Sequence, residues 1–179
     1  MPDQFTLASL DRQLLAPAPR APFFVETALI SSHAPWTPIP PIVPWDQLGD
    51  GRIFDPYATA GDPPDVVWRD PDRVRDQYRQ SLDYVLRTVA AFAARTPRPT
   101  LFIVLGDHQP AAFVSGDPAN RDVPIHLIGP PSVLAHLDPW GYTPGLIPAA
   151  DAPVWPMEAF RDRFLTAFGD AAPPLHAAR

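Results

Sequence analysis

The sequence has 179 residues, of which 46% are hydrophobic and 19% charged; this fits one globular domain with a proper core and excludes a disordered chain. Its net charge of -6 contains no basic block, which argues against nucleic acid or an anionic membrane surface as a partner. The absence of cysteine excludes disulfides, thiolate catalysis and cysteine-bound zinc. No apolar stretch reaches the length of a membrane-spanning helix, and the N-terminus lacks the pattern of an export signal.

The first part of the chain predicts a helix followed by a buried strand. Apolar residues at roughly helical spacing predict a helix over Asp3–Leu15, with Asp3 as its capping residue. After several prolines, the apolar run Phe23–Ile30 predicts a strand. His33 therefore lies just beyond the expected end of that strand.

The middle of the chain predicts a long loop and then the longest helix. Thr37–Arg69 is rich in proline, glycine and aspartate with aromatics interleaved, so we expect it to be functional or packed across the domain by those aromatics. A helix is predicted from Asp70 or Asp72 to about Arg95, as a crossover into the next strand. Its apolar face is formed by Val74, Tyr78, Leu82, Val85, Leu86, Val89 and Phe92.

The apolar run Thr100–Leu105 predicts the central strand of the sheet. It stops at Gly106 and delivers Asp107 and His108 at the carboxyl end of the strand, where open α/β sheets bind their ligands. A carboxylate oxygen beside an imidazole nitrogen suits zinc or manganese. On spacing alone, a second interpretation of Gly106, Asp107 and His108 is equally good. In it, Asp107 caps the following turn and His108 forms an ordinary polar contact.

The last part of the chain predicts a third strand over Val123–Ile128, which lies near a sheet edge or begins at Pro124 because proline cannot donate to a sheet. Pro131–Leu137 predicts a helical turn, and Met157–Phe168 predicts a closing amphipathic helix. The loop between Ala111 and Arg121 contains Ser115, Gly116 and Asn120.

These elements predict an α/β fold with a mainly parallel sheet flanked by helices. One domain is expected over residues 1–170, followed by a frayed tail over 171–179. If the strands that precede His33 and His108 are parallel neighbours, the two histidines face one pocket.

Six segments, in this order and covering nearly the whole chain, carry a resemblance to a known family. They are Met1–Phe5 (MPDQF), Ser31–Pro35 (SSHAP), Tyr78 with Ser81–Tyr84, Gly106–Pro110 (GDHQP), Asp122–Ile125 (DVPI) and Val154–Leu165 (VWPMEAFRDRFL). Together they resemble the C-terminal part of a sulfatase-like domain of the alkaline phosphatase superfamily, which includes lipoteichoic acid synthases and phosphoglycerol transferases. The chain also resembles actinobacterial membrane proteins of the sulfatase-like type.

The resemblance implies a fold like that of alkaline phosphatase and metal-dependent hydrolysis or transfer of a sulfate or phosphate ester, with a lipid head group among the possible substrates. Asp107 and His108 would be ligands of a divalent metal, manganese or zinc, and His33 would contact the sulfate or phosphate group. By the same resemblance, the full-length protein has membrane spans and carries this part outside the cytoplasm.

The family's first half supplies a glutamate metal ligand and a threonine or serine nucleophile, and neither is located in this sequence. In relatives the equivalent of MPDQF lies well inside the domain, so the chain is expected to begin in its middle. Asp107 and His108 supply two of the usual four ligands, which predicts weak or absent metal binding. Because the nucleophile binds the same ion, we expect this chain to be inactive alone.

Other residues have weaker assignments. Gln109 is expected to orient His108 or to reach the substrate, and Asp122 to hydrogen-bond the metal-site loop, although a turn at the start of a strand explains Asp122 equally well. His126, inside the third strand, is expected to be a hydrogen-bonded structural residue, and His136 and His176 surface residues.

Two other function classes compete with this interpretation. One is a non-catalytic binding or scaffolding module that keeps the same part of the fold. The other is a serine hydrolase that uses Ser32 and a histidine, which is weak because the sequence contains no GxSxG motif.

Overall fold

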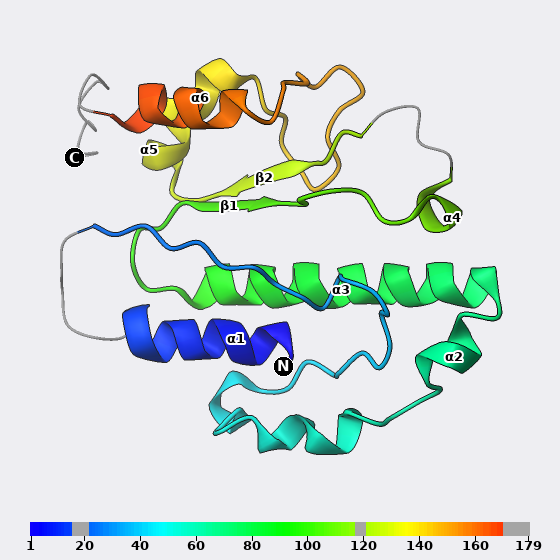
Figure 1. Cartoon of the computed structure of the whole chain (residues 1–179). Coiled ribbons are helices and arrows are strands. Elements are labelled where there is room, and N and C mark those ends of the chain that lie inside the picture. The colour runs from blue at the N-terminus through cyan, green and yellow to red at the C-terminus, as the bar shows by residue number, and fades with distance from the viewer. Residues whose placement is uncertain (16–21, 117–120, 170–179) are drawn as a thin grey trace. The chain divides into compact units, whose positions relative to one another are not determined.

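The computed structural model describes residues 1–15, 22–116 and 121–169, which form two compact units (Figure 1). Unit 1 contains Met1–Thr96 and Ala111–Gly116, and unit 2 contains Pro97–Pro110 and the described part of Asp117–Arg179. The predicted tail over 171–179 and two residues with sequence assignments, Asn120 and His176, lie outside the described residues.

Unit 1 is built on two helices that pack against each other, α1 (Asp3–Leu10) and α3 (Pro71–Arg95) (Figure 1). α1 continues as a π-helical turn, η1 (Asp11–Leu15), so the predicted helix over this part of the chain is confirmed. α3 begins after Asp70, whose carboxylate accepts hydrogen bonds from two backbone N–H groups of the first turn. This capping confirms the earlier of the two helix starts that the sequence allowed.

The buried face of α3 is partly polar. Val74, Val85, Val89 and Phe92 are buried as their spacing predicts. Ser81, Tyr84 and Thr88, however, are also buried, and they follow one another at intervals of one helical turn along the helix. The face of α3 that packs into the core therefore includes a line of hydroxyl groups beside the apolar residues that the sequence predicted.

The long segment between Thr37 and Arg69 is packed by its aromatic residues. It forms three short elements, η2 (Trp45–Gln47), η3 (Arg52–Tyr57) and α2 (Pro64–Val67). One buried cluster is formed by Ala8, Leu48 and Phe54, with Phe5, Val43, Trp45 and Ile53 against it. A second is formed by Trp36, Val67 and Val74, with Ala34, Tyr78 and Val114 against it. Val114 belongs to α4 (Ala112–Ser115).

The strand predicted over Phe23–Ile30 is wrong. These residues form no strand in the structure, and two of the apolar side chains, Phe24 and Ile30, are 76% and 56% exposed. Apolar, β-branched composition favours an extended backbone but does not supply the neighbouring chain that a sheet needs.

Unit 2 contains one sheet, in which β1 (Phe102–Leu105) pairs antiparallel with β2 (Ile125–Ile128). The register places Phe102 opposite Ile128 and Leu105 opposite Ile125. Both segments were predicted as strands, and β2 begins directly after Pro124. The predicted mainly parallel α/β sheet of the alkaline phosphatase type is wrong, because the described residues form only this antiparallel pair. For the same reason α3 is not a crossover between parallel strands.

The core of unit 2 lies between this sheet and the elements that follow it, α5 (Pro131–Leu134), η4 (Ala135–Trp140) and α6 (Ala159–Phe168). Its buried residues are Leu137, Trp140 and Ala167, packed by Leu101, Leu127, Leu134, Trp155, Phe160, Phe164 and Phe168. Leu101 and Leu127 attach the sheet to this cluster. A two-stranded sheet is marginal by itself, so these contacts hold it in place.

None of the helices formed by residues 1–15, 22–116 and 121–169 combines the length and the apolar character that crossing a bilayer requires.

Candidate functional site

Asp107 and His108 come directly after Gly106, the residue that follows β1 in unit 2, and they lie in a bend. His108 Nε2 lies 3.7 Å from Asp107 Oδ2, and the His108 backbone N–H donates to Asp107 Oδ1 at 3.0 Å. The side chains of Asp107 and His108 are 90% and 68% exposed. The acid and the imidazole therefore lie against each other and are open to solvent.

The tautomer of His108 is set by its neighbour. His108 Nδ1 lies 2.7 Å from the backbone carbonyl oxygen of Gln109. A carbonyl oxygen can only accept, so Nδ1 is the nitrogen that carries the proton and donates it to this bond. In neutral His108 the lone pair is then on Nε2, the nitrogen that lies beside Asp107.

Gln109 connects these two residues to Asp122, in the segment that leads into β2. Its side-chain Nε2 donates to the backbone oxygen of Asp122 at 3.0 Å. Gln109 therefore contacts the His108 ring through its own backbone carbonyl while its side chain holds the loop to Asp122. The role predicted for the Gln109 side chain, to orient His108 or to reach the substrate, stays a prediction.

His33 lies in unit 1, on a turn that its own backbone closes. The His33 N–H donates to the Ile30 carbonyl oxygen at 3.0 Å, and His33 Nδ1 donates to the Ala34 carbonyl oxygen at 2.8 Å. The side chain is exposed. His33 thus repeats the arrangement of His108, with Nδ1 bonded to the next carbonyl and Nε2 available to a ligand.

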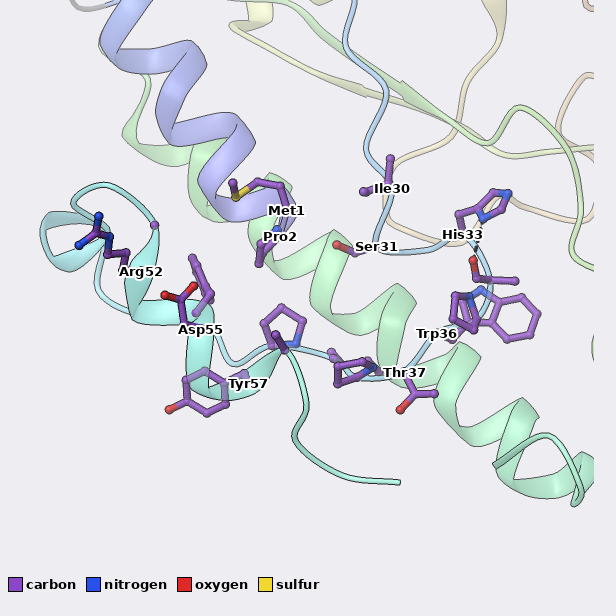
Figure 2. Close-up of a pocket in the computed structure, with 18 of the residues that line it drawn as sticks. Met1, Pro2, Ile30, Ser31, His33, Trp36, Thr37, Arg52, Asp55 and Tyr57 are labelled. Carbon is purple, nitrogen blue, oxygen red and sulfur yellow. Dashed lines mark hydrogen bonds between the residues drawn. The ribbon is translucent and has the colours of Figure 1, made fainter. Parts of the chain in front are cut away.

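A pocket of about 800 Å³ in unit 1 is lined by His33 (Figure 2). Figure 2 shows His33 and Trp36 at one end, on the turn, and residues of η3 at the other. Of the η3 residues, Arg52 forms an ion pair with Asp50 at 3.2 Å. The polar residues around the pocket are Ser31, His33, Thr37, Asp50, Arg52, Asp55 and Tyr57.

Two aromatic contacts support the turn that carries His33. The ring of Trp36 stacks on Trp68 with centroids 5.5 Å apart and meets Tyr78 edge-on at 5.1 Å. Trp36 Nε1 donates to the Ser32 carbonyl oxygen at 2.7 Å. Trp36 is 5% exposed and belongs to a buried cluster of unit 1, while it also lines the pocket.

His33 belongs to unit 1, and Asp107 and His108 belong to unit 2. The premise for a pocket shared by the two histidines, a pair of parallel neighbouring strands before them, is wrong, because Phe23–Ile30 forms no strand and the described sheet is antiparallel. Within residues 1–15, 22–116 and 121–169, no group of three or more histidine, aspartate or glutamate side chains is placed to hold a metal ion.

The Asp107–His108 pair still fits two positions of a metal site. Zinc–nitrogen and zinc–oxygen bonds of about 2.0–2.2 Å put two donors of a tetrahedral ion about 3.4 Å apart. The observed separation of 3.7 Å between His108 Nε2 and Asp107 Oδ2 is close to this value. The free lone pair on Nε2 is also the one that a metal would need.

The other histidines have structural surroundings where the structure describes them. His126 Nε2 lies 2.7 Å from the Leu146 carbonyl oxygen, which agrees with the structural role expected for it. The His136 ring packs against Phe168 with centroids 5.7 Å apart, so this residue is less exposed to solvent than expected.

Sequence reasoning missed the function of Asp3 and Gln4, which are 1% and 0% exposed. Asp3 does not cap α1, because the cap position is Pro2. Its carboxylate instead accepts hydrogen bonds from the Ile30 and Ser31 N–H groups. The available signal was two adjacent polar residues on the first turn of a helix, ahead of Leu7 and Ala8 on its buried face.

Tyr84 anchors the same turn of α1. Its hydroxyl accepts a hydrogen bond from the Gln4 backbone N–H at 3.3 Å, one of the helix-start groups that have no partner within the helix. Burial raises the pKa of the Tyr84 hydroxyl, and the nearby charge of Asp3 raises it further, while the bond from Gln4 opposes the shift.

Comparisons of the chain with protein-family models, with curated proteins and with solved structures found no match. A functional assignment therefore depends on the residues of this chain and their geometry.

Proposed function

We propose that this chain is the C-terminal part of a sulfatase-like, metal-dependent hydrolase or phosphotransferase that acts on sulfate or phosphate esters. The proposal concerns the chemistry of the residues and not the parallel sheet, which the structure overturns. It is supported by the six segments that resemble the family, and above all by one observation. Asp107 and His108 lie against each other in the open, 3.7 Å apart, directly after a strand.

In this proposal Asp107 Oδ2 and His108 Nε2 hold a divalent metal, manganese or zinc. A bound divalent ion neutralises charge on the transferring group and lowers the pKa of a coordinated hydroxyl. The chain's own contribution is to orient the donors: the Gln109 carbonyl fixes the His108 ring, and the Gln109 side chain fixes the loop to Asp122. Two donors alone bind weakly, so this chain by itself is inactive.

His33 would contact the sulfate or phosphate group. Because its Nδ1 proton is committed to the Ala34 carbonyl oxygen, the contact is made through Nε2. An anionic oxygen can only accept, so His33 donates to it when Nε2 carries a proton as well. In the full-length protein we place this site outside the cytoplasm, with a lipid head group among the candidate substrates.

A non-catalytic binding module is the second candidate. The observation that favours it is the pocket of about 800 Å³, which is formed within unit 1 and includes neither Asp107 nor His108. Such a pocket can accept a ligand without any metal chemistry.

Paramagnetic Mn²⁺ tests the metal assignment on this chain, because it broadens the NMR signals of nearby nuclei even when binding is weak. We expect Mn²⁺ to broaden the amide signals of Asp107, His108 and Gln109 first. The double variant Asp107→Asn/His108→Ala should lose this effect.

The matched control is His136→Ala/Asp138→Asn, which makes the same two changes elsewhere in unit 2 and should leave the broadening intact. If broadening is spread over other acidic residues and is unchanged in Asp107→Asn/His108→Ala, the metal assignment is wrong. The binding module would then be the better description.

A further inference from the structure

The segment from Ile30 to Val43, which carries His33 and lines the pocket of unit 1, is held at both ends by two adjacent residues of α1. At one end Asp3 Oδ1 accepts from the Ile30 N–H at 2.9 Å, and both oxygens of Asp3 accept from the Ser31 N–H at 3.2 Å. At the other end the Gln4 side chain donates to the Val43 carbonyl oxygen at 2.7 Å and accepts from the Val43 N–H at 3.1 Å.

Both side chains are removed from water, with exposed fractions of 1% for Asp3 and 0% for Gln4. A buried polar group that loses its partners is strongly unfavourable, and hydrogen bonds to a carboxylate are among the strongest in proteins. The ends of the segment are therefore fixed to α1 more firmly than exposed loop contacts would fix them.

A short path of hydrogen bonds leads from Asp3 to His33. Asp3 accepts from the N–H of Ile30, and the carbonyl of Ile30 accepts from the N–H of His33 at 3.0 Å. Ile30 is thus bonded on both sides of its backbone, and His33 is one bond further along. Displacement of Ile30 would move the turn that carries the imidazole.

We propose that Asp3 and Gln4 are positioning residues that hold the Ile30–Val43 segment, and with it His33, at the pocket. That His33 receives an anionic ester there depends on the function proposed above, whereas the positioning itself does not. Neither residue touches the ligand; both act through the backbone of the segment.

Hydrogen exchange of the full chain, followed by NMR, tests this proposal without a substrate. Asp3→Ala should speed exchange of the Ile30 and Ser31 amides by about ten- to a hundredfold, the range expected for losing a hydrogen bond to a charged group. It should also speed exchange of the His33 amide, whose acceptor is the carbonyl of Ile30. The His33 ring signals should move at the same time. Asp3→Asn has nearly the same shape and keeps one acceptor, so it should retain most of the protection of Ile30 and serves if Asp3→Ala does not fold.

The matched control is Asp11→Asn. Asp11 lies about two helical turns further on. It is the first residue of η1 and forms an ion pair with Arg95 at 3.6 Å. Exchange of the Ile30, Ser31 and His33 amides should be unchanged in this variant. Equal acceleration of all amides of α1 and α3 in Asp3→Ala would overturn the proposal, because it would show a general structural role. So would unchanged His33 ring signals.

Titration with inorganic phosphate separates the positioning proposal from the proposed function. A response of the His33 ring in the wild-type chain that weakens in Asp3→Ala supports both. A wild-type chain whose His33 does not respond, while the exchange results are as expected, supports the positioning role and counts against the ester site.

Discussion

The buried side chain of Gln4 pairs with the backbone of Val43 in both directions, donating from Nε2 at 2.7 Å and accepting at Oε1 at 3.1 Å. The two hydrogen bonds match those of a hydrogen-bonded residue pair in an antiparallel β-sheet, with the amide side chain of Gln4 in place of the backbone of a second strand. The pairing needs one donor and one acceptor on the same side chain, which a carboxylic acid provides only in its protonated form.

Gln4→Glu should therefore make stability depend on pH. Burial and the facing Val43 carbonyl raise the pKa of the introduced carboxyl above its value in the unfolded chain, about 4.3. The protonated carboxyl stabilises the folded chain fully below about pH 4.3, and this stabilisation is lost as pH rises through the folded-state pKa. The free energy of unfolding should fall by about 1–3 kcal/mol over this range. Urea unfolding at pH 4 and pH 7 measures the loss. Gln47→Glu, at an exposed position, should show little change, and equal behaviour of the two variants would contradict the expectation.

Tyr84→Phe should lower stability at neutral pH by about 1–3 kcal/mol, because the buried Gln4 N–H loses its acceptor. It should also change the alkaline limb of the stability profile. Burial raises the pKa of Tyr84 in the folded state, so the native chain keeps a proton that the unfolded chain releases above about pH 10.

Wild-type stability consequently falls as pH rises through that region, and the variant should lose less over the same range. The free energy of unfolding at pH 8 and pH 10.5 is the measurement. Parallel losses in both proteins would mean that Tyr84 is not the responsible group.

Gly51→Ala should destabilise unit 1 more than Gly61→Ala. Both glycines have positive φ, +93° and +82°, so alanine is strained at either position by about 1–2 kcal/mol. Only at Gly51 would the new Cβ meet a neighbour, at 2.8 Å from the Phe5 ring. The contact adds about 1–3 kcal/mol.

Thermal unfolding of the two single variants and of Gly51→Ala/Phe5→Leu separates strain from the contact. The double variant should recover part of the stability that Gly51→Ala loses through its contact with the Phe5 ring. No coupling between the two sites would show that the ring moves aside freely.

Leu137→Ala should loosen the sheet that carries Asp107. Leu137 is completely buried in the cluster of unit 2, so the cavity costs about 2–5 kcal/mol. We expect faster hydrogen exchange of the β1 and β2 amides. Leu165→Ala, at a side chain of α6 that is 57% exposed, is the control and should have a small effect. Similar exchange in both variants would mean that the cluster does not support the sheet.

Local features of this fold were predictable from the sequence. The capping Asp70 and the spacing of apolar residues correctly indicated the helix to Arg95, because both signals arise within the helix itself. The strands before Gly106 and after Pro124 were also indicated correctly. Asp107 and His108 lie where the sequence placed them, at the end of a strand.

The non-local features were not predictable. Strand direction depends on which segments meet, and neither composition nor spacing encodes it; hence the parallel sheet and the strand over Phe23–Ile30 were wrong. Asp3 resembled a helix cap because an aspartate at the start of a helix gives the same sequence pattern in both cases. Its carboxylate can bond the first turn of its own helix, or it can bond a segment distant in sequence, as it does at Ile30. The buried line of hydroxyls on α3 was hidden for the same reason, because its burial depends on which distant segments pack against the helix, as the bond between Gln4 and Tyr84 illustrates.

The antiparallel pairing of β1 and β2 determines which residues lie near Asp107 and His108. Opposite directions bring the exit of β1 beside the entrance of β2, as the bond from Gln109 to Asp122 illustrates. The segment that leads into β2, Arg121–Pro124, therefore lies at the same end of the sheet as Asp107 and His108. The residues directly after Ile128 emerge at the opposite end of the sheet.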